Sequence, residues 1–105
     1  MSHMKELFIA QTPDKLDEIV EIYGWVDTKR DHKKVIFLDL RDRTGIIQAV
    51  GDEKLREIST GDVVKATGLI KKRPERLINP KIPTGTIEME IQNIETHQCG
   101  IWQLK

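Results

Sequence analysis

KVIFLDLRD, at residues 34–42, is the stretch of sequence that decides the fold. Apolar side chains alternate in it with a period of two, which is typical of a β-strand that buries one face. The residues on the face that we expect to enter the core are Ile36, Leu38 and Leu40. The residues on the opposite face are Phe37, Asp39 and Arg41.

The same alternation continues on both sides of this stretch and predicts five strands. They cover residues 20–26, 35–41, 46–50, 64–70 and 87–91. Gly24 and Gly68 interrupt the first and the fourth strand, where a glycine often marks a sharp bend. Asp52 can cap a short helix over residues 53–58, because its side chain can accept from a free backbone N–H group of the first turn.

Five strands with one short helix between the third and the fourth match the five-stranded Greek-key barrel called the OB-fold. The predicted fold class is therefore all-β, although other small barrels also have five strands. We assign residues 5–95 to the barrel, residues 96–105 to a tail or the start of a linker, and residues 1–4 (MSHM) to an expression scar. Before the first strand, Thr12 can cap a helical turn with Pro13 at its first position.

The bulk composition limits the class of protein. The 105 residues include 17 basic and 17 acidic ones, and the net charge of zero argues against nucleic-acid binding by bulk charge alone. Two basic runs, TKRDHKK at 28–34 and KKRPER at 71–76, would nevertheless suit phosphates if they converge in space. No apolar run approaches the ~20 residues of a membrane helix. The single Cys99 fits a reducing, cytoplasmic location.

Two residues are candidates for contact with a nucleobase. Phe37 lies on the outward face of its strand, where it is either covered by a loop or the helix or available to stack on a base. Gln48 lies in the third strand among apolar neighbours, and its amide can both donate and accept, as the reading of an unpaired base requires. The alternative for Gln48 is a solvent-facing side chain.

Patterns of catalytic and metal-binding residues are weak. Asp39 and Asp42 lie on opposite faces of the strand and have no third ligand, so we expect them to form ion pairs instead. The expected partners are Arg41, Arg43 or lysine side chains. The histidines have no metal-ligand spacing with Cys99, and the sequence has no phosphate-binding glycine-rich loop and no Ser-His-Asp set. We therefore predict neither a metal, nor a cofactor, nor an active site in this chain.

Two longer segments closely resemble the anticodon-binding domain of bacterial-type aspartyl-tRNA synthetases, which are class II enzymes. They are GWVDTKRDHKKVIFLDLRDRTGIIQAV at 24–50 and GLIKKRPERLINPKIPTGTIEME at 68–90, and together they cover about half of the chain. The related lysyl and asparaginyl domains share a Gly-x-Val strand and an Arg-Asp turn. The combination of FLDLRDRTGIIQ with NPKIPTGTIE is characteristic of the aspartyl family.

The resemblance implies roles for five residues. It implies that Phe37 stacks on the middle anticodon base and that Gln48 hydrogen-bonds that base. It further implies that Arg30 contacts the anticodon loop, that Arg73 lies beside the bases, and that Glu88 helps to recognise the first anticodon base.

Two further implications are weaker. Asn79 lies in the loop before the last strand, where members of the family vary. Members with a histidine at the position of His32 often charge both aspartate and asparagine tRNAs, so we expect poor discrimination at the third anticodon base. A simple turn residue is the alternative for His32.

The resemblance also implies the partners. We expect the domain to bind the anticodon stem-loop of aspartate tRNA, and that of asparagine tRNA as well, and to bind no membrane. Class II motifs are missing from this sequence, so ATP and magnesium are expected only in the catalytic domain of a parent enzyme. We expect that parent to be a homodimer and the isolated domain a monomer. The alternatives are a free-standing single-stranded nucleic-acid-binding OB protein and a protein-interaction OB module anchored by Phe37.

Overall fold

The computed structural model describes residues 6–97, with the side chains of residues 6 and 97 excepted. The strands are β1 (Glu6–Leu7), β2 (Ile19–His32), β3 (Val35–Asp42), β4 (Gly45–Gly51), β5 (Val63–Lys72) and β6 (Ile87–His97). The short 3-10 helices between them are η1 (Ile9–Lys15), η2 (Glu53–Glu57) and η3 (Glu75–Leu77). The segment assigned to an expression scar, and the predicted tail beyond residue 97 with Cys99, lie outside the described residues.

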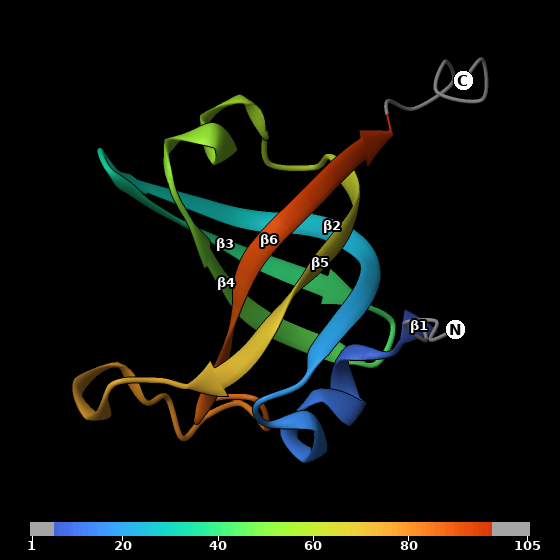
Figure 1. The fold of residues 1–105 in the computed structure, drawn as a ribbon, viewed down its shortest axis with the longest axis vertical. Helices are drawn as coiled ribbons and strands as arrows, with labels where there is room; N and C mark the ends of the chain where they lie inside the picture. Colours follow the sequence, from blue (N-terminus) through green and yellow to red (C-terminus); the bar gives the residue numbers. More distant parts are fainter. Residues whose placement is uncertain (1–5, 98–105) are drawn as a thin grey trace.

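The sheet closes into a barrel. Its strand order is β1-β2-β3-β4-β6-β5, and an additional pairing of β2 with β5 joins the two sides. Figure 1 shows how β2 bends around the barrel, so that its first half pairs with β5 and its second half with β3. Because β2 to β6 form the closed barrel and η2 lies between its third and fourth strands, the predicted all-β OB-fold is confirmed.

The interior of the barrel contains the predicted core residues. Ile36, Leu38 and Leu40 of β3 are all 0% exposed. They belong to one apolar cluster with buried residues of every other barrel strand, among them Val26, Ile47, Val64, Ala66, Ile70 and Met89. The register predicted for KVIFLDLRD is therefore correct, and the opposite face of β3 points outward.

The glycines at the predicted bends allow two close approaches of the backbone. A Cβ atom at Gly24 would collide with the carbonyl oxygen of Arg41, and a Cβ atom at Gly68 would collide with the carbonyl oxygen of Glu90. The backbone at these two positions is not left-handed. Steric exclusion by a neighbouring strand therefore requires glycine there, and not an unusual φ angle.

The predicted helix after β4 forms as η2. Asp52 is its N-cap residue and accepts a 2.9 Å hydrogen bond from the backbone N–H of Lys54. The prediction for Thr12 is wrong, because Thr12 is buried inside η1 and its hydroxyl donates to the carbonyl oxygen of Ile9 at 2.7 Å. A side chain from β3 replaces the expected cap: Oδ2 of Asp42 accepts from the backbone N–H of Ile9 at 2.8 Å.

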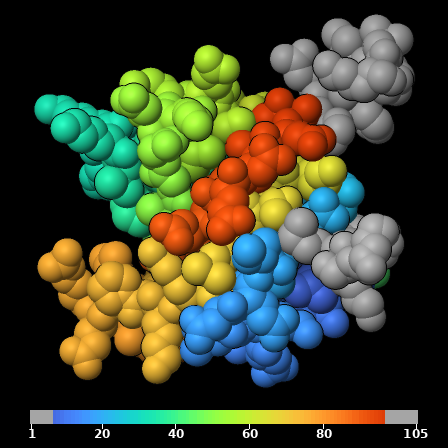
Figure 2. All heavy atoms as spheres, viewed as in Figure 1, coloured from blue at the N-terminus to red at the C-terminus, as the bar shows by residue number. Residues whose placement is uncertain are grey.

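Two segments project from the same side of the barrel. They are the tip of the β2–β3 hairpin and the 73–86 loop, which contains η3 (Figure 1). Figure 2 shows the surface notched between the atoms of the hairpin and the atoms of the loop. Together they frame the outer face of β3 and β4, which carries the residues considered next.

Candidate nucleic-acid interface

A bulge in β2 decides on which face Arg30 lies. The register of β2 against β3 shifts at Asp27. Val26, before the shift, lies opposite the buried Leu40, whereas Arg30, after it, lies opposite Phe37. Side chains alternate along a strand, so without the extra residue Arg30 would share the inward direction of Val26. The bulge therefore places Arg30 on the outer face, beside Phe37.

Arg30, Gln48 and Glu88 form a hydrogen-bonded chain across this outer face. Nη2 of Arg30 donates to Oε1 of Gln48 at 3.0 Å, and Nε2 of Gln48 donates to Oε1 of Glu88 at 3.1 Å. Gln48 is only 8% exposed, so the alternative of a solvent-facing glutamine is wrong. Lys71 lies 3.8 Å from the other carboxylate oxygen of Glu88. Three residues that the sequence singles out thus contact one another through two hydrogen bonds.

Asp39 anchors the arginine end of this chain. Its Oδ2 atom accepts from Nη1 of Arg30 at 3.0 Å and from the hydroxyl of Thr28 at 2.6 Å. The pairing of Asp39 with Arg41 or Arg43 is therefore a wrong prediction. The bulge brings Thr28 opposite Asp39. Arg41 has a different partner, because its Nε atom lies 3.5 Å from Oδ1 of Asp27.

Asp42 also departs from the prediction. Its carboxylate accepts from backbone N–H groups of Ile9, Thr44 and Gly45 and from the hydroxyl of Thr44. Burial alone would raise the pKa of Asp42, but these hydrogen bonds outweigh it and hold the pKa below its ordinary value. Asp42 therefore stabilises the fold at one end of the barrel and is not part of the candidate interface.

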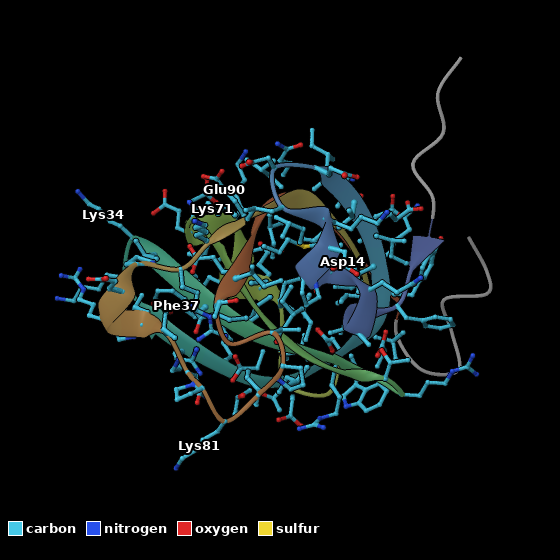
Figure 3. All side chains as sticks on the ribbon, turned by 90° about the horizontal axis from the view of Figure 1, so that it is seen from below. Asp14, Lys34, Phe37, Lys71, Lys81 and Glu90 are labelled. Atoms are coloured by element: carbon cyan, nitrogen blue, oxygen red, sulfur yellow. The ribbon has the colours of Figure 1, made fainter. Side chains whose placement is uncertain are left out.

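Phe37 is half-buried and borders open space. Its ring meets the imidazole of His32 edge to face, with 5.6 Å between the ring centroids. The guanidinium carbon of Arg30 lies 5.6 Å from the same centroid, within the range of a cation–π contact. Figure 3 shows the labelled Phe37 beside the 73–86 loop. The loop flanks the ring without burying it, so stacking on a base is sterically possible.

Two adjoining clefts separate the hairpin and the strands from the 73–86 loop. The first, which we call the aromatic cleft, has a volume of about 460 Å³, and its lining includes Lys34, Phe37, Lys71, Leu77, Glu88 and Glu90. The second, which we call the arginine cleft, has a volume of about 440 Å³, and its lining includes Arg30, Gln48, Arg73, Arg76, Leu77 and Asn79. Leu77 of the loop borders both, so the two clefts are neighbours.

The two basic runs converge at these clefts. Lys34 of the first run and Lys71 of the second both line the aromatic cleft. Arg30 of the first run and Arg76 of the second both line the arginine cleft. In the arginine cleft, arginines outnumber the one acidic residue, Asp39, so this cleft of a protein with no net charge is suited to phosphate groups. In the aromatic cleft, Asp52, Glu88 and Glu90 offset the two lysines.

Arg73 has a structural role beside its place in the arginine cleft. Nε donates to the carbonyl oxygen of Ile87 at 2.8 Å, and Nη1 donates to the carbonyl oxygen of Leu77 at 3.0 Å. Burial lowers the pKa of Arg73, and the nearby Glu88 opposes that shift. Two of its five N–H groups are used in these bonds, which connect Arg73 to η3 and to the start of β6.

Sequence reasoning missed Asp39 and Leu77 as members of this site, and it included Thr28 and Lys71 only as parts of the two basic runs. Alternation already placed Asp39 on the face of Phe37, but the bulge that brings Thr28 and Arg30 to it leaves no clear signal in the sequence. Leu77 reads as an ordinary loop residue, and only the folded loop places it between the clefts.

Within the described range, no three His, Cys, Asp or Glu side chains are grouped so that they could hold a metal ion. Of the helices in residues 6–97, none has the length and apolar character needed to span a membrane.

Comparisons with known proteins found a matching family model and similar sequences. A family model for tRNA anticodon domains, described as an OB-fold nucleic acid binding domain, matches residues 20–96. The aspartate–tRNA(Asp/Asn) ligase of Trichodesmium erythraeum is 47% identical over 90 residues, and that of Ruthia magnifica is 50% identical over 88 residues. Each alignment covers 78% of this chain but only 15% of the ligase.

A solved structure shows the same fold. A putative aspartyl-tRNA synthetase from Leishmania major superposes with a TM-score of 0.77 at 21% sequence identity. The superposition covers 91% of this chain and 21% of that protein. The resemblance read from the two sequence segments is therefore confirmed at the level of the domain.

Proposed function

The chain belongs to the family of OB-fold nucleic-acid-binding domains, and from this membership we propose that it binds the anticodon loop of a tRNA. In this proposal it acts as the anticodon-binding domain of an aspartate–tRNA ligase. The observation that carries the proposal is the hydrogen-bonded chain of Arg30, Gln48 and Glu88 next to the ring of Phe37. Stacking and base-edge groups are thus adjacent on one rigid sheet face.

Phe37 supplies the stacking surface. The ring borders the aromatic cleft, whereas Arg30 borders the arginine cleft, so a base can enter from the side of the ring that faces the first cleft. OB barrels hold single strands by such stacking, because every base has an aromatic face. The unpaired bases of a loop are accessible to it, whereas bases within a duplex are already stacked.

Gln48 and Glu88 supply the hydrogen-bonding groups that bind the edges of the bases. Gln48 lies diagonally across from Phe37 on the neighbouring strand, since its direct partner is Asp39. After its bonds to Arg30 and Glu88, the amide retains one N–H and one lone pair for a base. Glu88 accepts hydrogen bonds, which suits the N–H groups of guanine at the first anticodon position. Arg73 and Asn79, in the arginine cleft, lie where the flanking nucleotides or their phosphates would pass.

We propose aspartate tRNA as the partner and asparagine tRNA as a second one, since the similar ligases carry both in their names. The corresponding anticodons, GUC and GUU, differ in the third base. His32 makes a T-shaped contact with Phe37 and is itself exposed, so it is available to the nucleotide after the stacked one. Aminoacylation, with its ATP and magnesium, belongs in this proposal to the part of the ligases that this chain does not span.

The test is a titration of a labelled anticodon stem-loop into the domain. Three stem-loops are compared: GUC, GUU and a variant of GUC in which the middle U is replaced by A. The Phe37→Ala protein is titrated with the same three. We expect clear binding of GUC, a similar affinity for GUU, weaker binding of the middle-base variant, and weaker binding of all three loops by Phe37→Ala.

The outcomes separate the alternatives. Equal binding of all three stem-loops by both proteins would leave only charge-driven attachment and would favour a general single-strand-binding protein. A large preference for GUC over GUU would contradict the assignment of asparagine tRNA as a partner. No binding of any loop would contradict anticodon recognition by this domain alone and would favour a protein-interaction module.

A further inference from the structure

We infer that Asp39 is a positioning residue that locks the amide of Gln48 in one orientation and thereby sets which pyrimidine the site accepts. The inference rests on the proposed contact between Gln48 and an anticodon base. Asp39 acts through Arg30, which lies between the two side chains in the hydrogen-bonded chain.

Asp39 holds the guanidinium group of Arg30 at both terminal nitrogens. Nη1 donates to Oδ2 at 3.0 Å, and Nη2 lies 3.4 Å from Oδ1. The hydroxyl of Thr28 fixes the carboxylate in turn, with a 2.6 Å bond to Oδ2. A planar fork that is held at two points loses the rotational freedom of its long side chain. Because the same Nη2 donates to Gln48, Asp39 sets the direction of that donor.

Gln48 is held between two groups with opposite requirements. Arg30 can only donate hydrogen bonds, whereas the carboxylate of Glu88 accepts them. Oε1 therefore faces Arg30 and Nε2 faces Glu88. A half-turn of the amide would direct its N–H groups at Arg30 and its oxygen at Glu88, which is unfavourable on both sides. Glu88 therefore supplies one half of the lock and Arg30 the other, and the half that Arg30 supplies depends on Asp39.

The orientation of the amide matters because uracil and cytosine present opposite patterns. Uracil offers a carbonyl acceptor next to the N3–H donor, and cytosine offers an amino donor next to the N3 acceptor. An amide that is free to turn pairs with either base, as its two ends are an acceptor and a donor. A locked amide matches one pattern and leaves the other base with unpaired polar groups, which is the physical basis of discrimination.

The experiment compares the affinities for two stem-loops, GUC and GCC, which differ only in the middle pyrimidine. The variants are Asp39→Asn and a matched control, Asp27→Asn, whose carboxylate pairs with Arg41 on the same two strands. Each substitution removes one negative charge near the RNA and should strengthen the binding of both loops alike. We expect the wild type and Asp27→Asn to prefer GUC by roughly tenfold or more, and Asp39→Asn to show a clearly smaller preference, because only Glu88 still orients the amide.

Two further variants separate positioning from a general structural effect. Asp39→Glu retains a carboxylate and should recover part of the preference. In a Gln48→Ala background, Asp39→Asn should no longer change the ratio, because there is no amide left to orient. A wild type without any preference would contradict the proposed function itself. A wild-type preference that is undiminished in Asp39→Asn would overturn this inference and leave the proposed function intact.

Discussion

Nη2 of Arg30 lies 3.0 Å from Oε1 of Gln48, although β2 and β4, which carry these residues, do not pair with each other. β3 lies between them, and its Asp39 is the cross-strand partner of Gln48. Arg30 therefore reaches across β3 and joins three strands into one polar surface. Such a surface is already ordered before a ligand arrives, so less side-chain entropy is lost on binding.

Removal of the aromatic ring should weaken RNA binding without unfolding the domain. Phe37→Ala is expected to lower the affinity for the GUC stem-loop by about 1–3 kcal/mol, the usual worth of one base–aromatic stack. Tyr23→Ala is the matched control, because Tyr23 is 41% exposed and borders neither the aromatic nor the arginine cleft. Fluorescence titration measures both affinities. Equal losses in the two variants would show that Phe37 has no specific contact with a base.

Binding should depend on salt through the converging basic runs. Lys34 and Arg76 line different clefts, so Lys34→Gln and Arg76→Gln are expected to act independently. Each phosphate contact that is lost should reduce the slope of log affinity against log salt by roughly 0.7. Lys15→Gln, at the end of η1 and outside both clefts, serves as the control. Titrations at several salt concentrations give the slopes, and identical slopes in all proteins would place the phosphates elsewhere.

Truncation of the core should cost far more stability than truncation of the surface. Leu38 is 0% exposed inside the barrel, and Leu38→Ala is expected to lower the free energy of unfolding by about 2–5 kcal/mol through lost burial and a cavity. Ile19 opens β2 and is 46% exposed, so Ile19→Ala should change stability by only about 0.5 kcal/mol. Urea denaturation measures both. A similar small change in the two variants would contradict the register of β3.

The strands and the core were predictable because both follow from local alternation. KVIFLDLRD shows which residues of β3 enter the barrel. Gly24 and Gly68 were predicted only as bends, and the close backbone approaches at both positions became visible in the structure. The start of η1 was not predictable, since its first backbone donor, the N–H of Ile9, is satisfied by Asp42, which lies 33 residues away in the sequence. Contacts of this kind depend on the closed barrel and not on the local residue pattern.

The composition of the candidate site was predictable only in part. The family resemblance identified Arg30, Gln48 and Glu88, and these three are linked in the structure by hydrogen bonds. The partner of Asp39 could not be predicted, because a one-residue bulge in β2 exchanges the faces of all residues that follow it. The roles of these residues in binding RNA stay predictions for the titrations described above.

The carboxylate of Asp42 should make the stability of the domain depend on pH in the acidic range. The pKa of Asp42 in the folded protein lies below its ordinary value of 3.8, since hydrogen bonds from Thr44, Ile9 and Gly45 outweigh the effect of burial. A group with a depressed folded-state pKa contributes its full stability above the unfolded-state pKa and loses it as the pH falls through the folded-state value.

Asp42→Asn should therefore lower the free energy of unfolding at neutral pH, by about 1.5–3 kcal/mol if a charge-assisted bond is lost. The deficit relative to the wild type should begin to shrink below about pH 4, where Asp42 of the unfolded wild type becomes protonated, and should shrink further as the pH falls towards the lower folded-state pKa. Urea denaturation across pH 7 to 3 measures this difference, with the exposed Asp14 on η1 as the site of the control substitution Asp14→Asn. If the difference in free energy of unfolding stays constant down to the lowest pH, the negative charge of Asp42 does not contribute to the attachment of η1 to the barrel.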